Sequence, residues 1–125
     1  MIKRLILDEF GKDLCTNVLT IECTTLHQMK SLLKVLDLFG FKWNGGQSLL
    51  HNVEHEFEIA SRRTFNHSAY IGLMFFGWLN KDLECMGYRT DVESANERER
   101  VKAVPYKYAI EKLKNVKRRR NCHEE

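Results

Sequence analysis

The sequence has little proline, little glycine and no paired-cysteine motif. One proline and seven glycines in 125 residues are too few for a Pro/Gly-rich disordered chain or a collagen-like one. The sequence has four scattered cysteines, Cys15, Cys23, Cys85 and Cys122. Because they form no C-x-x-C pair, the sequence contains neither a zinc-ribbon motif nor a redox motif. We interpret the cysteines as free thiols of a cytosolic protein.

Long hydrophobic runs are also absent. The first residues contain only three consecutive apolar side chains before Asp8, so we expect no signal peptide. The longest apolar run, residues 69–79, is about half the length of the ~20 residues that a membrane-spanning helix needs. We therefore expect a cytoplasmic protein without membrane association.

The composition is that of a soluble globular domain, with 43% hydrophobic and 30% charged residues. A chain of this length can close one hydrophobic core, so we expect a single domain. The net charge of +3 is uneven: residues 1–60 carry six Lys/Arg and eight Asp/Glu, whereas residues 61–125 carry fourteen and nine. The basic character is strongest in residues 114–120, which hold five cations.

Two segments have the apolar spacing of amphipathic helices. Thr25 and Gln28 have the spacing of a capping box, and the apolar residues that follow predict a helix over residues 25–39. Pro105 suits the first turn of a second helix, over residues 105–118, in which the apolar residues form one stripe. Such stripes are typical of helices that pack against a core.

Four segments have patterns typical of strands. In residues 17–23 and 54–60, mainly apolar side chains alternate with mainly polar ones. Residues 41–44 alternate in the same way before an Asn-Gly-Gly turn. For residues 70–79 we favour a strand over the buried start of a helix, because two interior glycines weaken a helix more. Residues 2–7 are either another strand or a poorly ordered leader.

The remaining segments are polar. We expect a solvated connection at residues 90–104, where charges are mixed, and a basic, frayed C-terminus at residues 117–125. The order strand, helix, strand, strand, strand, helix predicts an α+β fold. In this fold two helices pack on one face of a mostly antiparallel sheet of about four strands.

The end of the first predicted helix carries a resemblance to known proteins. Residues 32–46, LLKVLDLFGFKWNGG, contain the pattern L-x-x-x-G-[aromatic]-x-W-x-x-G. With the strands on either side, over residues 17–60, the segment resembles a loose group of small accessory proteins encoded by tailed bacteriophages and other mobile elements. The resemblance implies a non-catalytic protein, without a cofactor, that binds a host or defence protein and modulates or inhibits it.

The stretch HNVEH places His51, Glu54 and His55 at the spacing of one class of zinc peptidase. Such a site needs both histidines on one helical face, one turn apart. In a strand four residues span about 13 Å, too far for two imidazoles to share one zinc at ~2 Å. Because the pattern predicts a strand here, we expect neither a metal site nor an enzyme.

The same predicted strand turns three glutamates outward. Such an acidic row either docks on a basic groove of another protein or keeps a solvent-facing strand from pairing with other edges. Exposed aromatic residues often anchor interfaces, so we combine both features into one predicted protein-binding surface. It consists of Trp43, Glu54, Glu56, Glu58, Tyr70 and Trp78. The oligomeric state stays open, with a homodimer as one alternative.

The basic run near the C-terminus supports a second hypothesis. Its cations are Lys114, Lys117, Arg118, Arg119 and Arg120. They are either a solvated helix end or contacts to the phosphates of a nucleic-acid backbone. No base-reading motif accompanies them, so any such binding should have little sequence preference.

Overall fold

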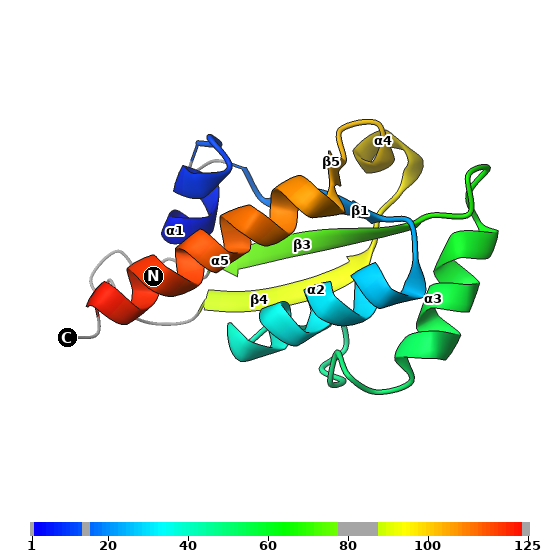
Figure 1. Cartoon of the computed structure of the whole chain (residues 1–125), viewed down its shortest axis with the longest axis horizontal. Coiled ribbons are helices and arrows are strands. Elements are labelled where there is room, and N and C mark those ends of the chain that lie inside the picture. Colours follow the sequence, from blue (N-terminus) through cyan, green and yellow to red (C-terminus); the bar gives the residue numbers. More distant parts are fainter. Residues whose placement is uncertain (1, 14–15, 78–87, 124–125) are drawn as a thin grey trace.

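The computed structural model describes residues 2–13, 16–77 and 88–123, which form five helices and five strands (Figure 1). In chain order the elements are α1 Ile2–Glu9, β1 Val18–Cys23, α2 Leu26–Leu38, β2 Lys42–Trp43, α3 Val53–Arg62, β3 Ala69–Gly77, β4 Tyr88–Ser94, α4 Glu97–Arg100, β5 Val104–Pro105 and α5 Tyr106–His123. They make one small α+β domain, which confirms the predicted fold class.

The strands form one mixed sheet in the order β2-β4-β3-β1-β5. Its centre is antiparallel, because β3 pairs with β1 on one side and with β4 on the other. Both edges are parallel, with β2 beside β4 and β5 beside β1, each over two residues. Edge strands as short as these offer few backbone groups to another chain.

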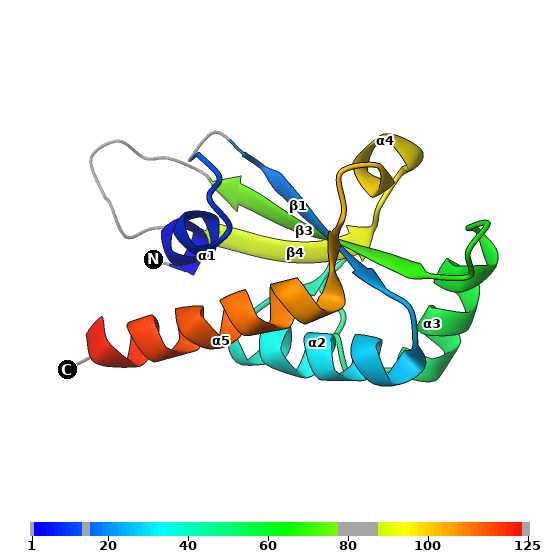
Figure 2. The same cartoon turned by 45° about the horizontal axis from the view of Figure 1, so that its top comes forward.

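Helices α2 and α5 lie side by side over one face of the sheet (Figure 2). Alternation along the central strands turns Ile21, Ile71 and Leu73 toward this layer, and all three are fully buried. The helices contribute the buried side chains Met29, Leu32, Leu33, Leu36, Ala109, Leu113 and Val116. The prediction of two helices on one face is confirmed, and α1 packs against α5 to extend the layer.

The ends of α2 follow from its sequence. The Thr25 hydroxyl accepts a hydrogen bond from the Gln28 backbone amide at 3.1 Å, as the capping box predicts. Gln28 Oε1 accepts from the backbone amide of Thr24 at 2.8 Å, one residue further back than expected. Gly40 ends the helix with φ of 93°, and the Phe41 amide donates to the Leu36 carbonyl at 3.0 Å.

The predicted strand at residues 54–60 is wrong, because Val53–Arg62 form α3. Val53, Phe57 and Ala60 follow each other at spacings of four and three residues, and all three contact the core. Val53 and Phe57 also fit an alternating pattern. Periodicity alone therefore does not distinguish helix from strand in so short a segment.

The predicted connection at residues 90–104 is also wrong in its first part, because Tyr88–Ser94 form β4 between β3 and β2. Val92 is fully buried, and Thr90 and Asp91 are nearly so. A strand with few apolar residues gives a weak local signal. Its neighbours in the sheet determine its conformation.

Both ends of the chain are more helical than predicted. Residues 2–7 belong to α1 rather than to a strand or a leader, and α5 continues past residue 118 to His123 instead of fraying. The two helices stabilise each other: the Phe10 and Tyr108 rings lie 5.9 Å apart, and Arg119 Nη1 lies 3.3 Å from Glu9 Oε1. These contacts are long-range and leave no local pattern.

Candidate functional site

The three glutamates of the predicted protein-binding surface do not form one acidic face. Glu54 and Glu58 share one side of α3, whereas Glu56 lies on the other side, since each residue turns the helix by about 100°. Lys30 Nζ lies 3.1 Å from Glu54 Oε1, and Arg62 pairs with Glu58. Two of the three carboxylates thus have a cationic partner within the chain.

The aromatic residues of that surface are also separated. Trp43 is partly buried against the core, and its indole nitrogen is buried without a hydrogen-bond partner in the described part of the chain. The register of the sheet places Tyr70 on the opposite face from Trp43. Trp78 lies outside the described residues. Tyr70 lines a cavity that is described below.

The HNVEH stretch is helical only in part. Glu54 and His55 lie in α3, but His51 precedes it, and the N-cap residue Asn52 has a left-handed backbone with φ of 53°. The sequence argument against a zinc site relied on a strand at this position, and that strand is wrong. His51 lies outside α3, so His51 and His55 do not lie one turn apart on one helix. In residues 2–13, 16–77 and 88–123, no three His, Cys, Asp or Glu side chains are grouped to hold a metal ion.

Tyr70 belongs to a hydrogen-bonded cluster on the face of the sheet away from α2 and α5. Its hydroxyl donates to Glu22 Oε2 at 2.7 Å, and Asn66 Nδ2 lies 2.9 Å from the same oxygen. Burial, followed by the hydrogen bond to Glu22, raises the pKa of Tyr70 above its ordinary value. The hydroxyl is therefore protonated at neutral pH and serves as a donor to Glu22.

A groove lies beside this cluster, between the loop that follows α3 and the short helix α4. Its larger part has a volume of about 520 Å³ and is lined by Arg63, Phe65, Tyr70, Arg100 and Val101, among others. An adjoining part of about 260 Å³ shares Arg63, Tyr70 and Arg100. We call this cavity the Arg63–Arg100 groove.

Antiparallel pairing brings the two walls of the groove together. The first wall precedes the start of β3 and the second follows the end of β4, and Ile71 of β3 pairs with Ser94 of β4. The end of one strand and the start of its neighbour therefore lie side by side. Arg100 Nη1 donates to the Arg63 carbonyl at 3.2 Å and joins the two walls directly.

The first wall is the loop of residues 63–68, which is held by side-chain hydrogen bonds and exposes an aromatic side chain. Thr64 Oγ1 lies 2.9 Å from the Ser68 carbonyl, and Asn66 is held by Glu22 and Tyr70. Between them Phe65 is fully exposed, at 107% of its reference area. Because aromatic residues are enriched in protein interfaces, Phe65 is the candidate contact residue of this wall.

None of the groove residues except Tyr70 was predicted from the sequence. The signal available was the single aromatic residue in the polar run Arg62-Arg63-Thr64-Phe65-Asn66-His67. The opposite wall fell within the segment predicted as a solvated connection. Nothing in the local pattern links the two walls, which are separated by more than thirty residues along the chain.

The cations of the C-terminal run divide into two groups. Lys114, Lys117 and Arg118 are exposed on α5. Arg119 turns toward α1, where its guanidinium lies 3.6 Å from Asp8 and 3.3 Å from Glu9, and Arg120 is half-buried. Only part of the predicted phosphate-binding set is thus directed toward solvent.

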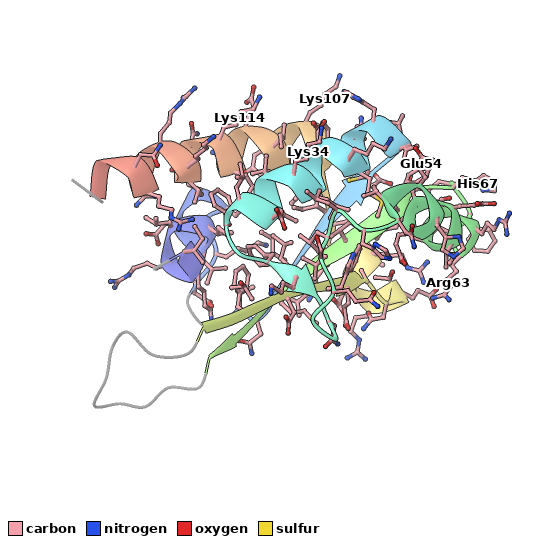
Figure 3. All side chains as sticks on the ribbon, turned by 90° about the horizontal axis from the view of Figure 1, so that it is seen from below. Lys34, Glu54, Arg63, His67, Lys107 and Lys114 are labelled. Carbon is pink, nitrogen blue, oxygen red and sulfur yellow. The ribbon has the colours of Figure 1, made fainter. Side chains whose placement is uncertain are left out.

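The exposed cations of α5 belong to a wider basic face. Lys107 and Lys114 of α5 and Lys34 of α2 lie on the side of the helix layer that points away from the sheet (Figure 3). Within the described part of the chain, none of these three lysines takes part in an ion pair. We call Lys34, Lys107, Lys114, Lys117 and Arg118 the basic helix face.

The groove and the basic helix face lie on different sides of the molecule, as the positions of Arg63 and Lys114 show (Figure 3). In the described ranges, no helix combines the length and the apolar character that crossing a membrane requires. Comparison of the chain with models of protein families, with curated proteins and with solved structures finds no match.

Proposed function

We propose that this chain is a non-catalytic protein of a bacteriophage or another mobile element, and that it binds a host or defence protein and alters its activity. The resemblance over residues 17–60 supports this origin. The observation that carries the binding function is the fully exposed Phe65 on the tied wall of the Arg63–Arg100 groove. Phenylalanine and arginine side chains are both enriched in protein–protein interfaces.

The burial and the raised pKa of Cys23 support a function in which this thiol is not a nucleophile. Cys23 is fully buried in the core. Burial, together with the nearby charge of Glu22, raises its pKa to about 12. A reactive cysteine needs an accessible thiolate, and this side chain has neither the access nor the charge at neutral pH.

A capture experiment tests the binding function. The tagged protein is expected to retain one host protein in stoichiometric amount from a bacterial lysate. Replacing Phe65 with serine should reduce the retained amount by about tenfold or more, because an interface anchor contributes at least ~1.4 kcal/mol. The amount is measured by quantitative mass spectrometry.

The matched control is Leu38→Ser, which removes another exposed apolar side chain, at 64% exposure, on α2. This variant should retain the host protein like the unmodified chain. Absence of any stoichiometric protein in lysates of several candidate hosts would contradict the proposed function. Equal loss in both variants, or no loss in Phe65→Ser, would contradict the assignment of Phe65 as the specific anchor.

The basic helix face favours a second candidate function, the binding of a nucleic-acid backbone. Its cations are exposed, come from two helices and form no ion pair in the described chain, although the exposed Glu111 lies between Lys107 and Lys114 on α5. Each cation that neutralises a phosphate releases counterions, so binding would weaken as salt concentration rises. We expect little preference for sequence, because the face offers lysines rather than a base-reading arrangement.

The triple substitution Lys107→Gln, Lys114→Gln and Arg118→Gln tests this candidate. If the face contacts duplex DNA, the slope of log affinity against log salt should become shallower by about 1 for each lost contact. The control, Lys12→Gln, Arg98→Gln and Lys102→Gln, removes the same charge from exposed positions elsewhere on the chain. Identical slopes for the two triple variants would exclude the basic helix face as the nucleic-acid site.

A further inference from the structure

We infer that the Arg63–Arg100 groove binds an acidic, extended segment of the partner protein, with an apolar side chain of that segment placed between Phe65 and Val101. The inference rests on the proposed function, because it names the chemistry that the protein partner presents. It combines an apolar and an electrostatic feature of the groove.

The apolar feature is the pairing of the two most exposed hydrophobic side chains. Five large hydrophobic residues are exposed in the described part of the chain: Leu38, Leu50, Phe65, Val101 and Tyr108. Phe65 and Val101 have the largest exposed fractions, 107% and 84%, and these two line the same groove. A side chain inserted between them would remove apolar surface of both residues from water. This burial would favour binding.

The walls that carry these two side chains are held in place. Val101 follows α4, where the Lys102 and Ala103 amides donate to the carbonyls of Glu99 and Arg100. Phe65 lies on the loop tied by Thr64 and Asn66. The partner therefore meets side chains on ordered backbone, and binding need not order the loop first.

The electrostatic feature is a pair of arginines that have no carboxylate partner in the described part of the chain. Arg63 and Arg100 both line the groove, and neither forms an ion pair with any described residue. Arg100 uses Nη1 on the Arg63 carbonyl, while its Nε is buried without an acceptor in the described part of the chain. Guanidinium groups bind carboxylates in a two-pronged geometry, so an acidic side chain fits these donors.

Two carboxylates of the described chain lie at or beside the groove, and neither forms an ion pair with Arg63 or Arg100. Glu22 accepts its hydrogen bonds from the uncharged side chains of Tyr70 and Asn66. Glu97 also lines the groove and makes it unfavourable for a continuous chain of phosphates, whereas separate carboxylates can face the arginines. A peptide with acidic and apolar side chains therefore fits better than a single-stranded nucleic acid. The volume of about 520 Å³ is also within the usual range of binding pockets.

A defined probe tests the groove without the natural partner. The probe is an acetylated pentapeptide with leucine at its centre and two glutamates on each side, titrated into ¹⁵N-labelled protein. We expect amide shifts confined to residues 63–70 and 97–101. A peptide with lysines in place of the glutamates, or glycine in place of the leucine, should bind about tenfold more weakly or worse.

Two variants and one control locate the contacts. Arg63→Glu and Phe65→Ser should each weaken binding of the pentapeptide by about tenfold, because each removes one of the two features. Arg98→Glu changes the charge by the same amount at an exposed position of α4 that does not line the groove, and should bind like the unmodified chain. A preserved amide spectrum shows that each variant is folded.

The inference is overturned by no saturable shift up to about 1 mM peptide, by equal binding of the lysine peptide, or by tighter binding of an oligouridylate. It is also overturned if Arg63→Glu binds the peptide as well as Arg98→Glu does. These outcomes differ from failure of the proposed function, which is the absence of a captured host protein. Capture that is insensitive to both Arg63 and Phe65 would preserve the function and reject the groove.

Discussion

Replacing Phe75 with alanine is expected to lower the free energy of unfolding by about 3–5 kcal/mol. Phe75 is only 2% exposed, and its ring meets that of Phe41 edge to face at a centroid distance of 5.8 Å. Lys3 Nζ lies 6.0 Å from the ring centroid, so the substitution also removes a contact to α1. Alanine would leave a cavity among well-packed groups. Urea denaturation followed by circular dichroism measures the change.

The matched control is Phe65→Ala, which removes the same side chain from a fully exposed position. Its effect on the free energy of unfolding should stay within about 0.5 kcal/mol, whereas its effect on binding should be large. Equal destabilisation by both substitutions would contradict this assignment of core and surface. The comparison also tests whether one face of β3 is buried core, as the structure places Ala69, Ile71, Leu73 and Phe75.

The second large effect is a loss of stability at high pH that depends on Cys23. The thiol has an ordinary pKa of 9.0, and in the folded chain burial, followed by the charge of Glu22, raises the pKa to about 12. Between pH 9 and 12 the unfolded chain releases this proton while the folded chain retains it. The free energy of unfolding should fall by about 1.4 kcal/mol per pH unit across this window, and this contribution is fully present only below pH 9.

Other groups also titrate in this range, and the variant Cys23→Ala separates their effects. The unmodified chain should lose about 4 kcal/mol more than the variant between pH 9 and 12. The raised pKa of Tyr70 acts in the same direction in both proteins and cancels in the difference. Parallel stability curves for the two proteins would show that Cys23 does not retain its proton as described. Chemical denaturation at several pH values provides the measurement.

The elements predicted correctly are those whose buried face shows in the local pattern. The leucines of α2 recur at helical spacing between a capping threonine and Gly40, and β1 alternates toward the core. The choice of a strand for β3 followed from two glycines, and Gly72 indeed lies in the sheet. In each case one segment contained the whole signal.

The elements missed are those stabilised mainly by distant partners. α1 and the last turns of α5 are held by contacts such as Glu9 with Arg119, and β4 lies in the sheet between two neighbours although few of its residues are apolar. In α3 a ten-residue segment fits helical spacing and, in part, alternation. Its packing against the core favoured the helix.

The sequence by itself determined the fold class, the helix layer on one face of the sheet, and the excess of positive charge in the C-terminal half. Only the tertiary structure decided which charges are available, because Arg119 faces α1 while Lys114 faces solvent. It also created the groove. Antiparallel pairing of β3 with β4 brings Arg63 and Phe65 beside Arg100 and Val101, and strand pairing between distant segments cannot be read from either segment alone.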